Sequence, residues 1–137
     1  MDKKDDLSPV LVIGTSGFGG SSFVKYLIER GVTVYGFSRS NEPDASFLPY
    51  KWVPTQELFS FEQLDLNSDL DRLLGRISEI KPKYIVNFAS QSMVGQSWDK
   101  PEDWIRTNVL AMTALLKGMA KSDFLEKYVH FTTPEVY

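Results

Sequence analysis

Short apolar runs alternate with amphipathic stretches along this chain. Four runs that are rich in β-branched and aromatic residues predict buried strands, at residues 10–13, 32–37, 83–89 and 127–133. A shorter run at residues 60–65 predicts a weaker fifth strand. Strands that alternate with helices in this way are typical of a parallel sheet with helices on its faces.

Three of the amphipathic stretches carry apolar residues at helical spacing. The stripes are Phe23, Val24, Leu27 and Ile28, then Leu70, Leu73, Leu74 and Ile77, then Ile105, Val109, Met112, Leu116 and Met119 in a helix that begins near Asp103. Gly31 and Pro82 are expected to end the first two helices. With right-handed crossovers, the pattern predicts one α/β domain over residues 1–137, with a doubly wound parallel sheet of five strands in the order 3-2-1-4-5.

Residues 14–20 read GTSGFGG and lie between the first strand and the first helix. A tight strand-to-helix turn requires glycine at Gly14, close approach of a diphosphate requires it at Gly17, and close helix packing requires it at Gly20. Free N–H groups and the helix dipole favour an anion there. Ser16 and Phe18 belong to the same turn and join the candidate cofactor-binding residues. A glycine-rich turn that binds nothing is the alternative.

Three later stretches extend this pattern: DLNSDLDRLL, NFASQSMVGQSWDKPEDWIRTNVLAMTALLKGM and HFTTPEVY. Together with the glycine spacing, they resemble the extended short-chain dehydrogenase/reductase family, particularly its nucleotide-sugar epimerases and dehydratases. The resemblance covers nearly every segment of the chain. It implies a Rossmann-type domain that binds NAD or NADP, with a nucleotide sugar as the substrate.

The resemblance assigns the adenine end of the cofactor to the exit of the third strand. Asp65 would hydrogen-bond the adenine amino group, and Leu66 would line the adenine pocket. The alternative is that Asp65 caps the helix that starts near Ser68.

The exit of the fourth strand is the expected place for the reacting end, because open α/β sheets bind ligands at the carboxyl ends of their strands. The resemblance implies that the ribose and nicotinamide pass Phe88, Ala89 and Ser90. Gln91 and Ser92 begin the sugar side and are candidate substrate-binding residues. Asn108 lies one turn inside the third helix, and its amide serves either the ligand or a structural hydrogen bond.

The exit of the second strand favours NADP over NAD. An NAD site usually offers an acidic residue there, whereas this chain reads GFSRSNEP and has no acid before Glu42. Ser38, Arg39 and Ser40 present a guanidinium and two hydroxyls that suit a 2′-phosphate. Arg39 as a solvated loop charge, with NAD as the cofactor, is the alternative.

The last residues imply the chemistry. By resemblance, Thr133 would hydrogen-bond the sugar C4 hydroxyl and Glu135 would take the proton from C5, which favours a 4,6-dehydratase over an epimerase or reductase, with GDP-mannose the preferred substrate. Pro134 lies between them and can supply no acid. The alternative is that Pro134 and Glu135 begin a helix.

The family's tyrosine, followed four residues later by a lysine, is absent from these 137 residues. We therefore expect a truncated, amino-terminal part that is inactive alone, without the active-site helix and the sugar-binding region. A non-catalytic dinucleotide-binding module is the competing interpretation. The exposed edge of the fifth strand, or the third helix, is expected to mediate homodimerisation or other self-association.

Composition narrows the remaining classes. A net charge of −3 provides no positive surface to attract nucleic acid, and no apolar run is long enough to span a membrane. We therefore expect no nucleic-acid partner, no membrane association and a cytoplasmic location. The chain has no cysteine and a single histidine. We therefore expect no disulfide and no metal site.

Overall fold

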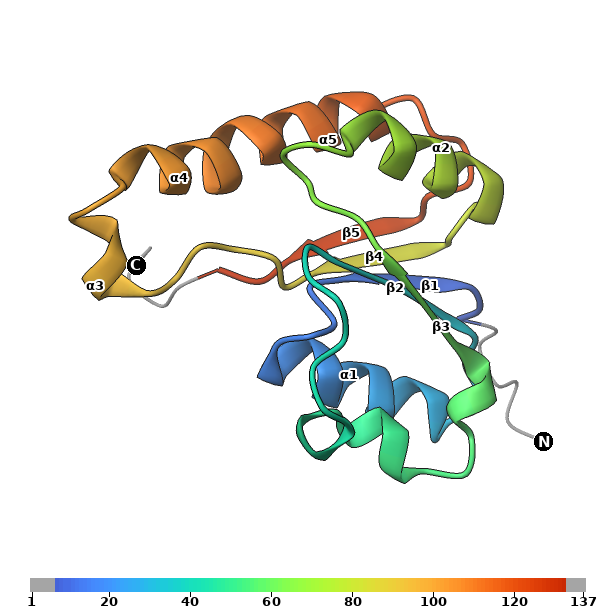
Figure 1. Cartoon of the computed structure of the whole chain (residues 1–137). Coiled ribbons are helices and arrows are strands. Elements are labelled where there is room, and N and C mark those ends of the chain that lie inside the picture. The colour runs from blue at the N-terminus through green and yellow to red at the C-terminus, as the bar shows by residue number, and fades with distance from the viewer. Residues whose placement is uncertain (1–6, 133–137) are drawn as a thin grey trace.

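The fold is a five-stranded parallel sheet in the order β3-β2-β1-β4-β5, seen in a computed structural model that describes residues 7–132 (Figure 1). The strands are β1 (Val10–Ile13), β2 (Val34–Ser38), β3 (Phe59–Gln63), β4 (Tyr84–Asn87) and β5 (Lys127–His130). Each neighbouring pair runs parallel. The predicted fold class and strand order are confirmed.

Several strands are shorter than the sequence predicts because side chains and helix ends capture their terminal N–H groups. β4 ends at Asn87, since the Asn87 side-chain oxygen accepts the N–H of Ala89 at 2.8 Å. β2 begins at Val34, since the N–H of Val32 donates to Leu27 at the end of the first helix. β5 is an edge strand and is largely exposed, so the prediction that it is buried was wrong.

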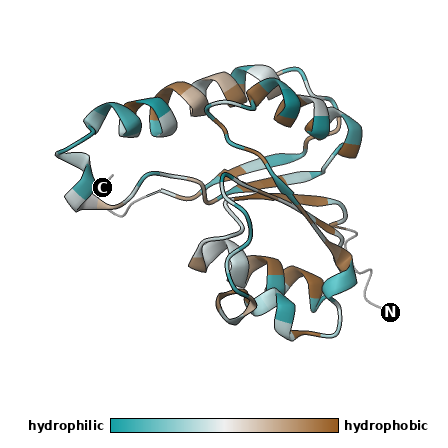
Figure 2. Cartoon of the chain, viewed as in Figure 1, coloured by the Kyte–Doolittle hydropathy of each residue, from teal (hydrophilic) through white to brown (hydrophobic). Residues whose placement is uncertain are grey.

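Helices cover both faces of the sheet (Figure 1). One face is covered by α1 (Phe18–Ile28) and by the short 3-10 segments η1 (Ala45–Phe47), η2 (Pro49–Trp52) and η3 (Gln56–Leu58). The other is covered by α2 (Leu70–Ile80) and α5 (Met112–Met119). Successive side chains of β1 point to opposite faces of the sheet. Val10 and Val12 pack in the core on the α1 side, and Leu11 and Ile13 pack in the core on the α2 side. Apolar residues accordingly concentrate along the strands in Figure 2.

The third predicted helix is a longer helical run with an irregular centre. It begins with α4 (Pro101–Ile105), passes through the π-helical turn η4 (Arg106–Ala111), and continues as α5; the four-residue α3 (Val94–Ser97) precedes it. Met112 and Met119 are buried as predicted, whereas Ile105 is 57% exposed and Val109 50%. Leu116 is also 42% exposed, because Leu115 takes the buried position in α5. The single apolar stripe was therefore wrong: a π turn holds more residues per turn and rotates the preceding residues, Ile105 and Val109, off the buried face.

Candidate functional site

A cavity of about 340 Å³ opens at the carboxyl ends of β1, β2, β3 and β4. Its lining residues are Ile13, Gly14, Ser16, Gly17, Ser38, Arg39, Ser40, Leu64, Asp65, Leu66, Asn67, Phe88, Ala89, Ser90, Gln91 and Thr107. Strand order reverses between β1 and β4, which is where open α/β sheets bind their ligands. The carboxyl ends of these four strands therefore lie around one pocket.

The glycine-rich turn is shaped by contacts that leave no room for side chains. Gly14 has a φ of +88°, and a Cβ there would lie 2.8 Å from the Ala89 nitrogen. A Cβ on Gly20 would lie 2.1 Å from the Gly14 oxygen, so α1 packs directly on the turn. A Cβ on Gly17 would meet only the Gly14 oxygen, at an ordinary 3.7 Å. The protein itself therefore has no steric need for glycine at Gly17, which faces the pocket.

The amino-terminal end of α1 suits an anion. Gly17 is its N-cap and provides no side-chain cap, and the first turn carries no acidic residue. The helix dipole at this end is therefore not neutralised by its own side chains. The neighbouring Ser16 N–H donates to the Ser38 Oγ at 3.0 Å, and the Thr15 and Ser38 hydroxyls lie 3.3 Å apart. The Ser38 hydroxyl thus secures the turn to β2.

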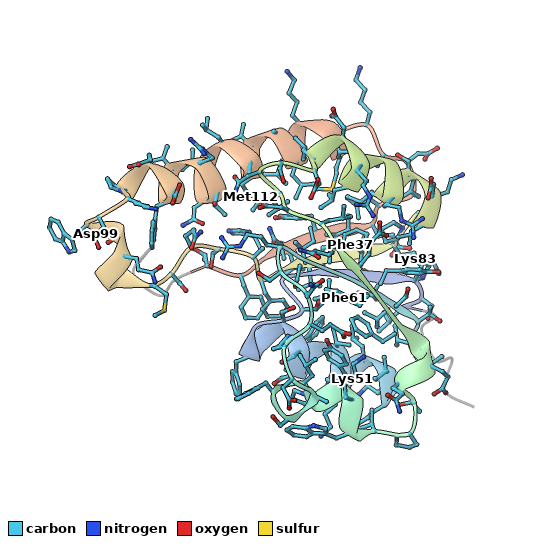
Figure 3. The ribbon with its side chains drawn as sticks, viewed as in Figure 1. Phe37, Lys51, Phe61, Lys83, Asp99 and Met112 are labelled. Carbon is cyan, nitrogen blue, oxygen red and sulfur yellow. The ribbon has the colours of Figure 1, made fainter. Side chains whose placement is uncertain are left out.

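Arg39 lies beside this turn with an exposed side chain. Its carbonyl oxygen accepts a hydrogen bond from Gln63 Nε2 at 2.9 Å, which ties the exit of β2 to β3. Within residues 7–132, no described side chain pairs with the Arg39 guanidinium. Arg39 also borders an outer cavity of about 390 Å³ near α3 and α4, lined too by Gln91, Gln96, Asp99, Lys100, Asp103 and Trp104. Figure 3 labels Asp99 at that outer end of the molecule.

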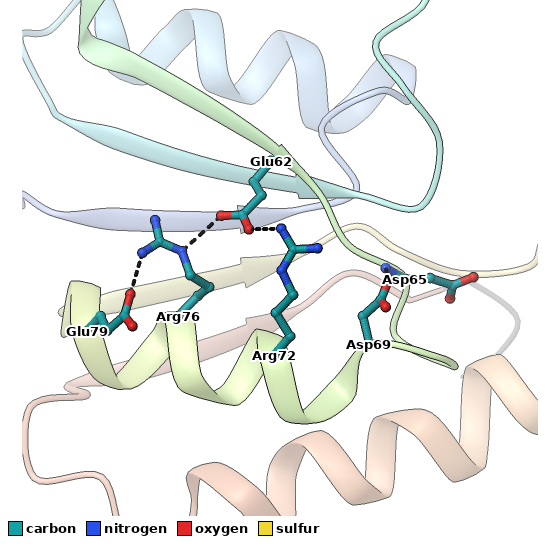
Figure 4. A network of polar contacts seen from close by, with 6 residues as sticks. All are labelled: Glu62, Asp65, Asp69, Arg72, Arg76 and Glu79. Atoms are coloured by element: carbon teal, nitrogen blue, oxygen red, sulfur yellow. Dashed lines mark hydrogen bonds and ion pairs between the residues drawn. The ribbon is translucent and has the colours of Figure 1, made fainter.

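Asp65 is positioned by a polar turn between β3 and α2. Its backbone N–H donates to the Asp69 carboxylate at 2.9 Å (Figure 4). Its own carboxylate accepts the Asn67 N–H at 2.8 Å. Nearby, Glu62 of β3 binds both Arg72 and Arg76 of α2. α2 begins at Leu70 with Asp69 as its N-cap residue, so the Asp65 carboxylate does not cap this helix.

The exit of β4 is held by two asparagine amides. Asn87 is fully buried, and its Nδ2 donates to the Tyr128 hydroxyl at 3.0 Å, while burial raises the pKa of Tyr128. Asn108 accepts the Gln91 N–H at 2.9 Å and donates to the Gln91 oxygen at 3.0 Å. In this structure, therefore, the Asn108 amide holds the loop backbone, as in the structural alternative predicted from the sequence.

Comparison with known proteins identifies the family. The family model of GDP-mannose 4,6 dehydratase matches residues 11–137. The chain belongs to this family. It is 28% identical to CDP-glucose 4,6-dehydratase of Salmonella typhimurium over 93% of its length, and 32% identical to human UDP-glucose 4-epimerase over 93%. The chain spans 35% and 38% of the length of these two relatives.

A solved structure supports the same assignment. UDP-glucose-4-epimerase from Stenotrophomonas maltophila, with bound NAD and formylated UDP-arabinopyranose, superposes with a TM-score of 0.79 and 26% identity. The match covers 93% of this chain and 38% of that one. The GDP-mannose 4,6-dehydratase family thus brings together dehydratases and epimerases of nucleotide sugars, with an NAD-binding Rossmann region.

Most of the predicted site residues line the pocket of this family member. Those that do are Gly14, Ser16, Gly17, Ser38, Arg39, Asp65, Leu66, Phe88, Ala89, Ser90 and Gln91. Gly20 and Asn108 lie behind it, in the packing and hydrogen bonds described above. Phe18 is 89% exposed at the start of α1, and Ser92 is exposed beyond Gln91. Thr133 and Glu135 lie outside the described residues.

Sequence reasoning missed part of the lining, notably Asn67 and Thr107. Asn67 Nδ2 donates to Thr107 Oγ1 at 3.0 Å, which joins the β3 exit to η4 across 40 positions of sequence. The turn DLN signals the role of Asn67, because an aspartate two residues earlier favours an Asx-turn. Thr107 has no comparable local signal.

Two further findings concern metal sites and membrane-spanning helices. Among residues 7–132, no group of histidine, cysteine, aspartate or glutamate side chains is placed to hold a metal ion. No helix in that part of the chain is both long and apolar enough to cross a membrane.

Proposed function

We propose that this protein is an NADP-dependent nucleotide-sugar dehydratase of the 4,6-dehydratase type, and that the chain forms its cofactor-binding part. One observation carries the proposal: the glycine turn, the open end of α1 and Arg39 line the same pocket. Uncapped N–H groups and a guanidinium suit a ligand with a diphosphate and a further phosphate.

The pocket residues divide along the length of a dinucleotide. Gly14, Gly17 and the end of α1 would hold the diphosphate, and Asp65 with Leu66 would hold the adenine. Ala89 and Ser90 would face the nicotinamide ribose, because they are small and lie at the exit of a central strand. Gln91 and Ser92 would begin the contacts to the sugar.

NADP is proposed over NAD because of Arg39 and Ser40. A guanidinium binds a phosphate dianion with charge-assisted hydrogen bonds, and no carboxylate from the β2 exit lines the pocket to repel it. Ser38 contributes differently from the sequence-based expectation, since its hydroxyl already accepts the Ser16 N–H.

The proposed chemistry uses two further residues of this chain. Bound NADP⁺ would supply a reversible hydride acceptor, so that the hydride removed from C4 of the sugar returns to C6 after water has left and the net change is the loss of one water. The proton of the C4 hydroxyl would go to a base other than Thr133 and Glu135. Thr133 would orient the C4 hydroxyl, and Glu135 would remove the C5 proton so that water can leave across C5 and C6. Pro134 can donate no proton, so the acid that protonates the leaving hydroxyl must be another group.

Epimerase activity is the second candidate, since the human UDP-glucose 4-epimerase is about as similar to this chain as the dehydratases are.

We also propose a homodimer, because the helical run from α4 to α5 exposes the apolar side chains of Ile105, Val109, Leu110 and Leu116.

Calorimetric titration of the purified protein with NADP⁺ and NAD⁺ tests the cofactor. We expect NADP⁺ to bind more tightly than NAD⁺. Arg39→Gln should lower the affinity for NADP⁺ about tenfold, because a charge-assisted hydrogen bond is lost. Lys100→Gln is the matched control: it removes a cation that lines only the outer cavity, and it should leave both affinities unchanged. Equal binding of both cofactors would refute the NADP assignment, and binding of neither would refute the function.

Product analysis of the whole enzyme, of which this chain is proposed to form the cofactor-binding part, tests the reaction with GDP-mannose, CDP-glucose, dTDP-glucose and UDP-glucose. A dehydratase yields a product that has lost one water by mass spectrometry. A product of unchanged mass with an inverted sugar carbon would establish the epimerase instead.

A further inference from the structure

Glu42 is the first acidic residue after β2, yet it does not line the pocket. Arg39 and Ser40, three and two residues earlier, both do. Two trans peptide units separate the Cα atoms of Ser40 and Glu42 by at most about 7.6 Å. An unrestrained Glu42 side chain therefore lies within reach of the ribose end of the pocket.

Both carboxylate oxygens of Glu42 are bound by residues of η2, which contributes nothing to the pocket lining. The Tyr50 hydroxyl donates to Oε1 at 2.7 Å, and the Lys51 Nζ lies 3.1 Å from Oε2. The Glu42 side chain is 24% exposed and that of Lys51 36%, so the pair is partly shielded from water. Figure 3 labels Lys51 in the layer of α1 and the 3-10 segments, and neither Tyr50 nor Lys51 lines the pocket.

Tyr50 anchors this arrangement in the core. It is fully buried in η2, and its ring centroid lies 4.5 Å from that of Phe59 on β3. Leu48 and Val53 belong to the same core cluster. A buried hydroxyl that loses its acceptor destabilises the fold, so the packing of Tyr50 itself favours the observed position of Glu42.

We infer that Tyr50 and Lys51 form a clamp that withholds the Glu42 carboxylate from the pocket and so determines the preference for NADP over NAD. The inference rests on the proposed function. A carboxylate at this end of the pocket binds the ribose hydroxyls of NAD and repels a 2′-phosphate. Glu42 is the acidic residue nearest in sequence to the β2 exit, and the clamp holds its carboxylate against Tyr50 and Lys51 instead of the cofactor.

The test releases Glu42 with Tyr50→Phe and Lys51→Met together. Phenylalanine keeps the buried ring and leaves no unpaired hydroxyl, so the core packing is retained. We expect the ratio of NADP⁺ to NAD⁺ affinity, measured by calorimetry, to fall about tenfold as the freed carboxylate faces the phosphate. Adding Glu42→Gln to the double variant should restore the wild-type ratio, since the repelling charge is gone.

The outcomes separate this inference from the proposed function. A wild-type protein without a preference for NADP⁺ overturns the cofactor assignment and the clamp with it. A wild-type preference that persists in the double variant overturns only the clamp. A ratio that falls and is not restored by Glu42→Gln also overturns it, because the loop rather than the charge is then responsible. If the double variant does not fold by circular dichroism, Lys51→Met with and without Glu42→Gln makes the same comparison, with an expected change of about threefold.

Discussion

The exits of β1 and β4 are neighbouring walls of one pocket, and they are held in place by opposite means. At the β1 exit the fit depends on absent side chains, since a Cβ on Gly20 would lie 2.1 Å from the Gly14 oxygen. At the β4 exit it depends on side-chain amides, with Asn87 bound to the Ala89 N–H and Asn108 to Gln91. Steric exclusion tolerates no substitution, whereas each hydrogen bond contributes about 1 kcal/mol.

This difference matches the proposed tasks of the two walls. The diphosphate is the same in every dinucleotide, so a rigid backbone cradle suits the β1 exit. The β4 exit would face the reacting end, where the nucleotide sugar also enters. A wall built from separate hydrogen bonds can be adjusted there one contact at a time.

The largest effect is expected for Gly20→Ala, which breaks the sterically determined wall. The added methyl group would overlap the Gly14 oxygen and force α1 away from the turn, at a cost of about 3 kcal/mol. Chemical denaturation measures the loss, and titration with NADP⁺ should show no binding.

Gly75→Ala is the matched control, because Gly75 is an exposed glycine inside α2 and a Cβ there would meet nothing within 4 Å beyond its chain neighbours and the backbone of its own helix. It should stabilise the protein by about 0.5–1 kcal/mol through helix propensity. Equal destabilisation by the two substitutions would show that the turn is not uniquely intolerant.

The same contrast explains how much the sequence could predict. The spacing of Gly14, Gly17 and Gly20 is local in sequence, so it identifies both the turn and its packing. Asn108 and Gln91 lie 17 positions apart, and their contact depends on the π turn η4. Periodicity carries no signal for such a turn, which is also why Ile105 and Val109 were assigned to the buried face.

Strand order was predictable for a different reason. Continuous apolar runs separated by amphipathic helices leave few right-handed parallel topologies, and the order 3-2-1-4-5 is one of them. Strand ends were less predictable, because the Asn87 side chain, and not a hydrophobic boundary, ends β4. Periodicity thus predicts the layers, whereas side-chain hydrogen bonds set the details of the site.

An intermediate effect is expected for Asn87→Ala at the second wall. Asn87 is fully buried, and its loss leaves the Ala89 N–H and the Tyr128 hydroxyl without this partner. Because a fully buried side chain with several hydrogen bonds is removed, the substitution should destabilise the fold by about 2 kcal/mol in chemical denaturation. Ser60→Ala is the control, since Ser60 is an exposed residue of β3 and its substitution should change stability by less than about 0.5 kcal/mol. A loss in Asn87→Ala no greater than that of the control would contradict the assigned role.

The smallest effect on stability is expected for Asn108→Ala, which sharpens the comparison by separating local order from global stability. Its partner Gln91 is only partly buried, so water can replace the lost hydrogen bonds and the cost should be about 1 kcal/mol. Hydrogen exchange should nevertheless accelerate at the Gln91 amide, because the Asn108 oxygen is its acceptor. Asn108→Asp retains that oxygen and should preserve the protection of Gln91, although it removes the donor to the Gln91 carbonyl. Unchanged exchange in Asn108→Ala would mean that the Asn108 amide does not protect the Gln91 N–H, and the β4 wall would then depend on Asn87 without Asn108.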